Sequence, residues 1–140
     1  MEKVDPIEAR HMARTWSERT RQADQETRYQ QFLSWQESDL SCPCCGLLPH
    51  HSLVHSLRAL SAVFQVTSGR RCRKHNDQVG GSPRSRHLDG IAADCVLHSS
   101  MDSGAFIREA VKQGFRGIGI YRKHIHIDLR EQERCSLWVI

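Results

Sequence analysis

The stretch Ser85–Asp94 constrains this chain more than any other part of it. It reads Ser-Arg-His-Leu-Asp-Gly-Ile-Ala-Ala-Asp, so a histidine, His87, and an aspartate, Asp94, are separated by a glycine turn and small residues. Gly90 lets the chain double back, because glycine adopts backbone angles that other residues avoid. We therefore expect His87 and Asp94 to approach one point. The alternative is that His87 is a surface residue and Asp94 caps a helix.

A second polar cluster follows much later, at His124-Ile125-His126-Ile127-Asp128. Side chains alternate between the two faces of a strand, so His124, His126 and Asp128 would share one face while the isoleucines enter the core. An ordinary edge strand alternates in the same way, but the first stretch makes a shared site the better interpretation. Two imidazoles and a carboxylate suffice to hold a catalytic zinc ion with one position open for water.

Length and composition indicate one small soluble domain with an appendage. The chain has 140 residues, of which 39% are hydrophobic and 26% charged, and its net charge is +4. This mild positive charge favours contact with an anionic polymer, either cell wall or nucleic acid, or serves solubility alone. No apolar run reaches the ~20 residues needed to span a membrane. The N-terminus lacks the apolar segment of a signal peptide, so we expect synthesis in the cytoplasm.

The order of the elements predicts an α+β fold. Residues 1–38 form a mostly polar N-terminal helical extension, with a helix from about 6 to 36, and residues 39–140 form the functional domain. Within the domain we expect a small, mostly antiparallel sheet with helices on one side and the metal at the strand ends. The expected helices cover 49–62 and 102–113, and the expected strands cover 63–67, 91–97, 117–121, 124–129 and 137–140. A long basic loop joins 68 to 85.

Several ordered motifs resemble those of a known family. Residues 85–94 look like the S-x-H-x-x-G-x-A-x-D signature of the zinc D-Ala-D-Ala carboxypeptidases, a family that also contains phage L-Ala-D-Glu endopeptidases and shares its fold with the Hedgehog signalling domain. Residues 67–81 resemble its T-S-G-x-R…N…V-G-G segment, and residues 117–128 its G-I-G-x-Y…H-x-D ending. The turn at 42–46 is similar to the start of the phage-type members. The resemblance covers about residues 40–138.

The resemblance implies a zinc peptidase that cleaves peptidoglycan stem peptides with a metal-activated water. Its zinc ligands would be His87, Asp94 and His126. Arg71 matches the arginine that steadies the substrate carbonyl or carboxylate, and Ser85 would hydrogen-bond near the metal or the substrate. Both a carboxypeptidase and an endolysin-type endopeptidase fit. Such an enzyme would reach the wall after phage-type release.

The general base is where this sequence departs from the family. Many members place an acidic residue three positions before the last zinc histidine, where this chain has Lys123. His124 resembles an H-x-H version of the site and is our preferred catalytic group. Asp128, on the same strand face, either takes part in catalysis or orients a zinc histidine. Asp89 is a weaker candidate for the base.

Two other functions are compatible with the sequence. Lys123 and the long polar helix also suit a noncatalytic zinc module, wall-binding or structural in a phage particle. The basic run 70–74 suggests a nucleic-acid module, but the cysteine spacing fits no zinc finger, so we expect no nucleic-acid partner.

The oligomeric state stays open, a monomer included. Cys42, Cys44 and Cys45 would join a second metal site with Cys72 or a histidine, or form only a packed or redox-labile turn; the usual C-x-x-C pairs of zinc ribbons are absent.

Overall fold

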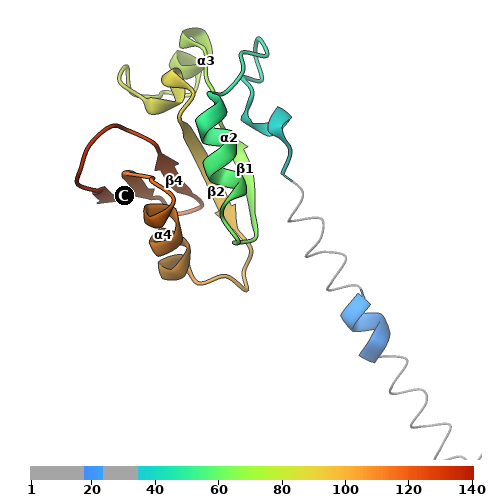
Figure 1. Cartoon of the computed structure of the whole chain (residues 1–140). Coiled ribbons are helices and arrows are strands. Elements are labelled where there is room, and N and C mark those ends of the chain that lie inside the picture. Colours follow the sequence, from blue (N-terminus) through green and yellow to red (C-terminus); the bar gives the residue numbers. More distant parts are fainter. Residues whose placement is uncertain (1–17, 24–34) are drawn as a thin grey trace, which may run out of the picture.

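The computed structural model describes residues 18–23 and 35–140 (Figure 1). Residues 18–23 are helical and exposed, within the helix predicted for 6–36. Most of that predicted helix lies outside the described residues. Residues 35 and 36 are not helical, and the short 3-10 helix η1 follows at Glu37–Leu40. The boundary between extension and domain at residue 38 stays a prediction.

A five-stranded sheet forms the centre of the domain, in the order β1-β2-β4-β3-β5. All neighbouring strands are antiparallel except β3 and β5, which are parallel. The strands are β1 (Phe64–Ser68), β2 (Ala92–Leu97), β3 (Gly117–Ile120), β4 (Ile125–Asp128) and β5 (Ser136–Val139). The mixed α+β fold and the mostly antiparallel sheet were predicted correctly.

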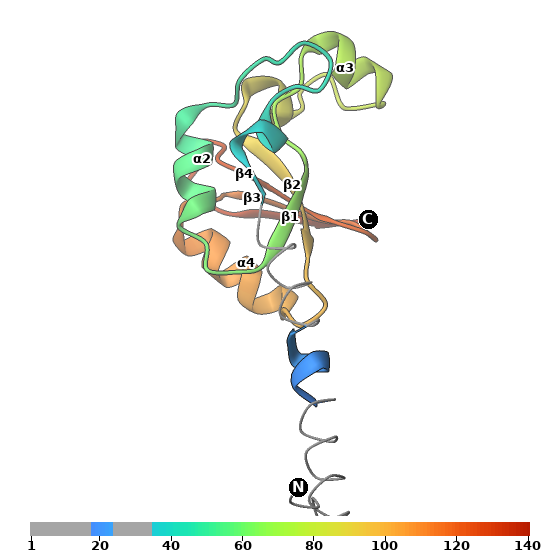
Figure 2. The same cartoon turned by 90° about the vertical axis from the view of Figure 1, so that its right-hand side faces the viewer.

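Two helices cover one face of this sheet (Figure 2). They are α2 (His51–Arg58) and α4 (Ser103–Lys112), and their buried residues include Leu53, Leu57 and Phe106. Asp102 caps α4, since its carboxylate accepts a hydrogen bond from the Gly104 N–H at 3.1 Å. The helices pack against apolar side chains of the three central strands, namely Ala93, Cys95, Ile118, Ile125 and Ile127. This layer is the hydrophobic core.

The opposite face of the sheet is approached by the segment between β1 and β2, for which we predicted only a loop. This segment contains helix α3 (Arg73–Gln78) and the 3-10 helix η2 (Arg86–Asp89). The helix begins where the Cys72 sulfur accepts a hydrogen bond from the His75 N–H at 3.4 Å, a local cap that the hydrophobic pattern does not reveal. In the part of the chain that the structure describes, no helix is long and apolar enough to cross a membrane.

Candidate metal centre

His87, Asp94 and His126 converge on the sheet face that the helices leave open. Asp94 and His126 are direct partners across β2 and β4, and His87 comes from η2. The Asp94 Oδ1 atom lies 3.1 Å from both His87 Nε2 and His126 Nδ1. One candidate ligand atom from each residue lies within 4.8 Å of the others. The three residues meet as the sequence predicted, but on the face of the sheet and not at its strand ends.

The backbone turn after His87 makes this meeting geometrically feasible. Gly90 has φ 73°, in the left-handed region where glycine is favoured. Asp94 is buried in the middle of β2, so the alternative in which it caps a helix is wrong. His87 is only 2% exposed, so it is not a surface residue either.

The second nitrogen of each imidazole is already engaged, which fixes the ring orientation. His87 Nδ1 lies 2.7 Å from the Gly69 carbonyl oxygen, which can only accept, so this nitrogen carries the hydrogen. His126 Nε2 lies 2.8 Å from the Asp128 carboxylate. In neutral rings the lone pairs are then on His87 Nε2 and His126 Nδ1, both facing Asp94. Two lone pairs and a carboxylate oxygen that share one space suit a bound cation.

The pKa shifts of Asp94 and His126 show that each group stabilises the charged form of the other. Burial by itself would raise the pKa of Asp94, but hydrogen bonds from His126 and His87 outweigh it and hold that pKa well below its usual range. Burial would lower the pKa of His126, yet hydrogen bonds to Asp128 and Asp94 raise it. Without a metal, Asp94 and Asp128 thus favour the protonated form of His126. A divalent cation at the same place would displace that proton.

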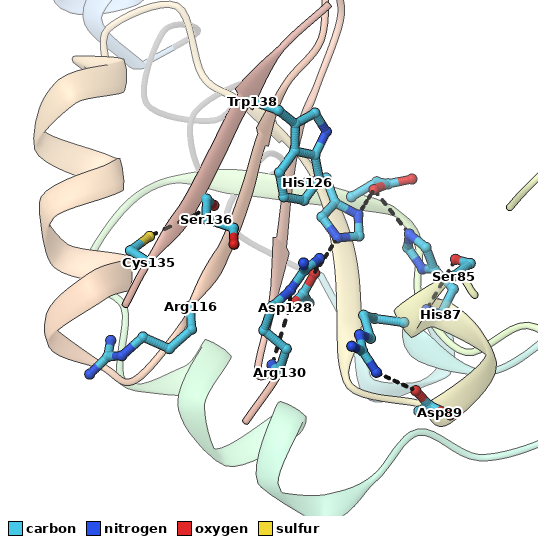
Figure 3. A network of polar contacts seen from close by, with 12 residues as sticks. Ser85, His87, Asp89, Arg116, His126, Asp128, Arg130, Cys135, Ser136 and Trp138 are labelled. Atoms are coloured by element: carbon cyan, nitrogen blue, oxygen red, sulfur yellow. Dashed lines mark hydrogen bonds and ion pairs between the residues drawn. The ribbon is translucent and has the colours of Figure 1, made fainter. Parts of the chain in front are cut away.

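A second layer of residues supports His126 from behind (Figure 3). Asp128 is fully buried and accepts hydrogen bonds from Arg130 Nε at 2.8 Å and Arg130 Nη2 at 2.7 Å, in addition to its contact with His126. Burial would raise the pKa of Asp128, but the bonds from Arg130 and His126 keep it well below its usual range. The Trp138 ring lies 5.4 Å from the His126 ring and 5.1 Å from the Arg130 guanidinium carbon. Asp128 thus contacts the candidate ligand His126 but does not line the cavity described below.

Strand register places these groups in one row across the sheet. Ser68, Asp94, His126, Gly119 and Trp138 are successive partners on β1, β2, β4, β3 and β5. A side chain at position 119 would collide with the Trp138 indole, so the glycine lets the tryptophan lie over β3 toward His126. The row therefore depends on a close approach that only glycine permits.

Arg71 enters the centre from the other side and is held at three points. Its Nη2 lies 3.3 Å from Asp94 Oδ2, its Nε donates to Ser68 Oγ at 3.1 Å, and its Nη1 donates to the buried Asn76 Oδ1 at 3.3 Å. Because the guanidinium is fixed in this way, it presents a positioned cation next to the candidate metal. The sequence placed Arg71 at the site, and the structure brings it there.

His124 lies at the edge of the centre and is partly open to solvent. Its Nε2 is 3.8 Å from Asp94 Oδ1, and its side chain is 30% exposed. The ring stacks on Tyr121 with centroids 4.5 Å apart, which limits its orientations. The adjacent Lys123 is exposed, and it does not line the cavity.

Of the two remaining predicted residues, Ser85 lies at the site and Asp89 lies away from it. The Ser85 hydroxyl oxygen accepts a hydrogen bond from the His87 N–H at 3.3 Å, so it starts η2, and it also borders the cavity. Asp89 is exposed and paired with Arg86 at 3.6 Å, outside the cavity. This position does not suit Asp89 as a general base.

A cavity of about 400 Å³ opens onto His87, Asp94 and His126. Four arginines line it in addition to the candidate ligands, namely Arg71, Arg84, Arg86 and Arg130. The aromatic wall is formed by Tyr121 and Trp138. Such a lining suits a ligand that carries one or more carboxylates and a less polar portion.

Arg130 and Trp138 also belong to the site, although neither was predicted from the sequence. The alternation from His124 through Asp128 continues to position 130, so strand periodicity offered a signal for Arg130. Trp138 had no such signal, because its position depends on the parallel pairing of β5 with β3.

Comparison with known proteins assigns the chain to a family. A search of curated proteins gave no match. The family model for Peptidase M15 matches residues 8–128, which includes every predicted ligand and also much of the N-terminal segment. With most of the chain matched, this protein belongs to the peptidase M15 family, a family of zinc-dependent metallopeptidases.

Proposed function

We propose that this chain hydrolyses peptide bonds in the stem peptides of peptidoglycan, with a zinc ion held by His87, Asp94 and His126. The observation that carries the proposal is the convergence of three ligand atoms within 4.8 Å of one another beside a cavity lined by arginines. The action of such an enzyme would be at the cell wall.

The donor set fits zinc. Two imidazole nitrogens and a carboxylate oxygen form a three-residue set that leaves a fourth position for water or substrate. When bound, zinc lowers the pKa of a water molecule and polarises a peptide carbonyl. The backbone carbonyl behind His87 and the carboxylate behind His126 support this role, because both keep the ligand nitrogen free of hydrogen.

Arg71 supplies positive charge where the scissile carbonyl would gain negative charge. Its guanidinium lies 3.3 Å from the Asp94 carboxylate and also borders the cavity. The contacts to Ser68 and Asn76 hold it before substrate arrives, so little reorganisation is needed during the reaction. Arg71 would bind the substrate carbonyl or carboxylate, and Ser85 would contact the substrate at the cavity edge.

His124 is the group best placed to take a proton from the attacking water. It lies near the centre and is partly exposed to solvent. Its Nε2 atom is 3.8 Å from the Asp94 carboxylate, too far for a direct hydrogen bond. A neutral imidazole within reach of the attacking water can act as a general base. Asp128 acts through His126, so we now give it a positioning role and not a direct catalytic one.

The arginines favour an anionic peptide as the substrate. Peptidoglycan stems carry free carboxylates, and Arg84, Arg86 and Arg130 line the cavity beside the candidate zinc ligands. A carboxypeptidase, whose substrate ends in a carboxylate, fits this lining. So does an endopeptidase that cuts beside an acidic residue of the stem.

The test is digestion of purified cell walls by the zinc-loaded protein, followed by mass analysis of the fragments. Release of D-alanine would identify a carboxypeptidase, and cleaved stems would identify an endopeptidase. The matched control is His87→Ala, which removes one ligand. Stoichiometric zinc binding and wall binding without any fragment above this control would contradict the proposal and select a noncatalytic module.

A further inference from the structure

A second group of metal-ligating side chains lies outside the site described above. The sulfur atoms of Cys42, Cys45 and Cys72 lie within 4.8 Å of one another. A fourth thiol is adjacent, with Cys44 Sγ 3.7 Å from Cys72 Sγ. None of the six cysteines, all in the described range 35–140, forms a disulfide. Two separate parts of the chain therefore bring four thiols together at one place.

The local backbone is shaped around these sulfurs. Cys42 donates its N–H to the Leu47 carbonyl at 2.9 Å, and its own carbonyl accepts from the Gly46 N–H at 2.8 Å, which closes a tight turn. The Cys72 N–H points at Cys42 Sγ at 3.4 Å. Backbone N–H groups directed at sulfur favour a thiolate, the form that binds metals.

The spacing within the turn also matches a metal site. Cys42 and Cys45 are three positions apart and form a single C-x-x-C unit, without the second unit that zinc ribbons have. The remaining sulfur comes from Cys72, some thirty residues later and at the start of α3. Only the fold brings it to the turn.

We propose that Cys42, Cys45 and Cys72 bind a second zinc ion, with Cys44 completing the set. Tetrahedral sites made of cysteine sulfurs are typical of structural zinc, which has no open position for substrate. Cys42 is buried while Cys44 and Cys45 are exposed, so the ion would lie at the surface with one side against the domain.

This zinc would stabilise the segment that carries Arg71. Arg71 directly precedes Cys72, and its N–H donates to the His87 carbonyl at 2.9 Å. On the same segment, the Arg70 N–H donates to the Leu40 carbonyl at 2.7 Å, next to the cysteine turn. The second ion would tie the turn to the start of α3 and thereby restrain Arg71. Its existence does not depend on peptidase activity.

Metal analysis gives the first test. Protein purified with reductant and excess zinc, then desalted, should hold two zinc ions per chain. The double variant His87→Ala/Asp94→Asn should hold one ion, and Cys45→Ser should also hold one. Cys135→Ser is the matched control, because Cys135 is exposed, donates to the Ser136 carbonyl and is not part of the cysteine group; it should keep two.

Replacement of zinc by cobalt(II) gives the second test, because it reports the kind of ligand atom directly. Sulfur ligands produce an intense thiolate-to-cobalt absorption that nitrogen and oxygen ligands do not produce. Wild type and His87→Ala/Asp94→Asn should both show this band, whereas Cys45→Ser should lose most of it. A wild-type protein with no band, a His87→Ala/Asp94→Asn variant that holds no zinc, or a disulfide between Cys44 and Cys72 despite reductant would overturn the proposal. None of these results depends on whether walls are cleaved.

Discussion

The two faces of the central sheet differ in chemistry although both are buried. Along β2 and β4, Ala93 and Ile127 face the helices, while Asp94 and Asp128 lie on the other side. Ile127 and Asp128 are adjacent in sequence and both are 0% exposed. Strand alternation thus lets neighbouring residues serve stability and chemistry separately.

The energetic cost of the two faces differs as well. Burial of the apolar face releases surface from water and stabilises the fold. A buried carboxylate is unfavourable unless it is paired, and both Asp94 and Asp128 have charged or imidazole partners on more than one side. We therefore expect substitutions on the helix-covered face to affect stability, and substitutions on the polar face to affect metal binding and turnover.

The largest effect is expected for Asp94→Asn. Loss of the anionic ligand should prevent zinc binding at this centre and lower kcat/KM at least about a thousandfold, which corresponds to about 4 kcal/mol in the barrier. Wall digestion with and without zinc measures it, and circular dichroism checks the fold. Activity within tenfold of wild type would break the division between the faces.

Phe106→Ala tests the opposite face. Phe106 is 1% exposed and packs edge-on against Phe64 with ring centroids 5.6 Å apart. We expect the free energy of unfolding to fall by about 3–5 kcal/mol, while turnover per folded molecule at low temperature stays within about twofold. Urea unfolding measures the first quantity. The exposed Gln65→Ala on β1 is the control, and a large loss of turnover in Phe106→Ala alone would show that the faces are coupled.

Asp128→Asn should have an intermediate effect on the polar face. The amide is a poorer acceptor for His126 Nε2, so zinc affinity should fall about 10–100-fold. Competition with a chromogenic chelator measures this affinity. Asp89→Asn is the matched carboxylate control, since Asp89 is exposed and outside the cavity, and it should leave affinity and turnover unchanged. Equal affinities for the two variants would remove the positioning role of Asp128.

The smallest effect is expected for Tyr121→Phe. The change removes the hydroxyl that accepts the Trp138 Nε1–H bond at 3.2 Å but keeps the ring stacked on His124. Unfolding free energy should fall by about 1 kcal/mol, with turnover changed less than threefold. Tyr121→Ala also removes the stacking and should lower kcat more than Tyr121→Phe does. Equal kcat values for the two variants would argue against orientation of His124 by the ring.

Local patterns predicted the ligand-bearing parts of this site, while long-range pairing determined the rest. Alternation at 124–128 and the glycine turn before Asp94 predicted correctly which side chains meet. Trp138 was not predicted, because its place beside His126 follows from the register of β5 on β3 and from the space above Gly119. The position of the cluster on the sheet face also depends on how α3 and η2 fold over the strands, which no short window of sequence specifies.

The two imidazoles differ in what orients them. His87 is held by a main-chain oxygen, that of Gly69, which no point substitution can delete. His126 is held by a side-chain carboxylate, which one codon change can remove. Substitution of Asp128 can therefore change the basicity of His126 directly. The orientation of His87 changes only if the backbone at Gly69 moves.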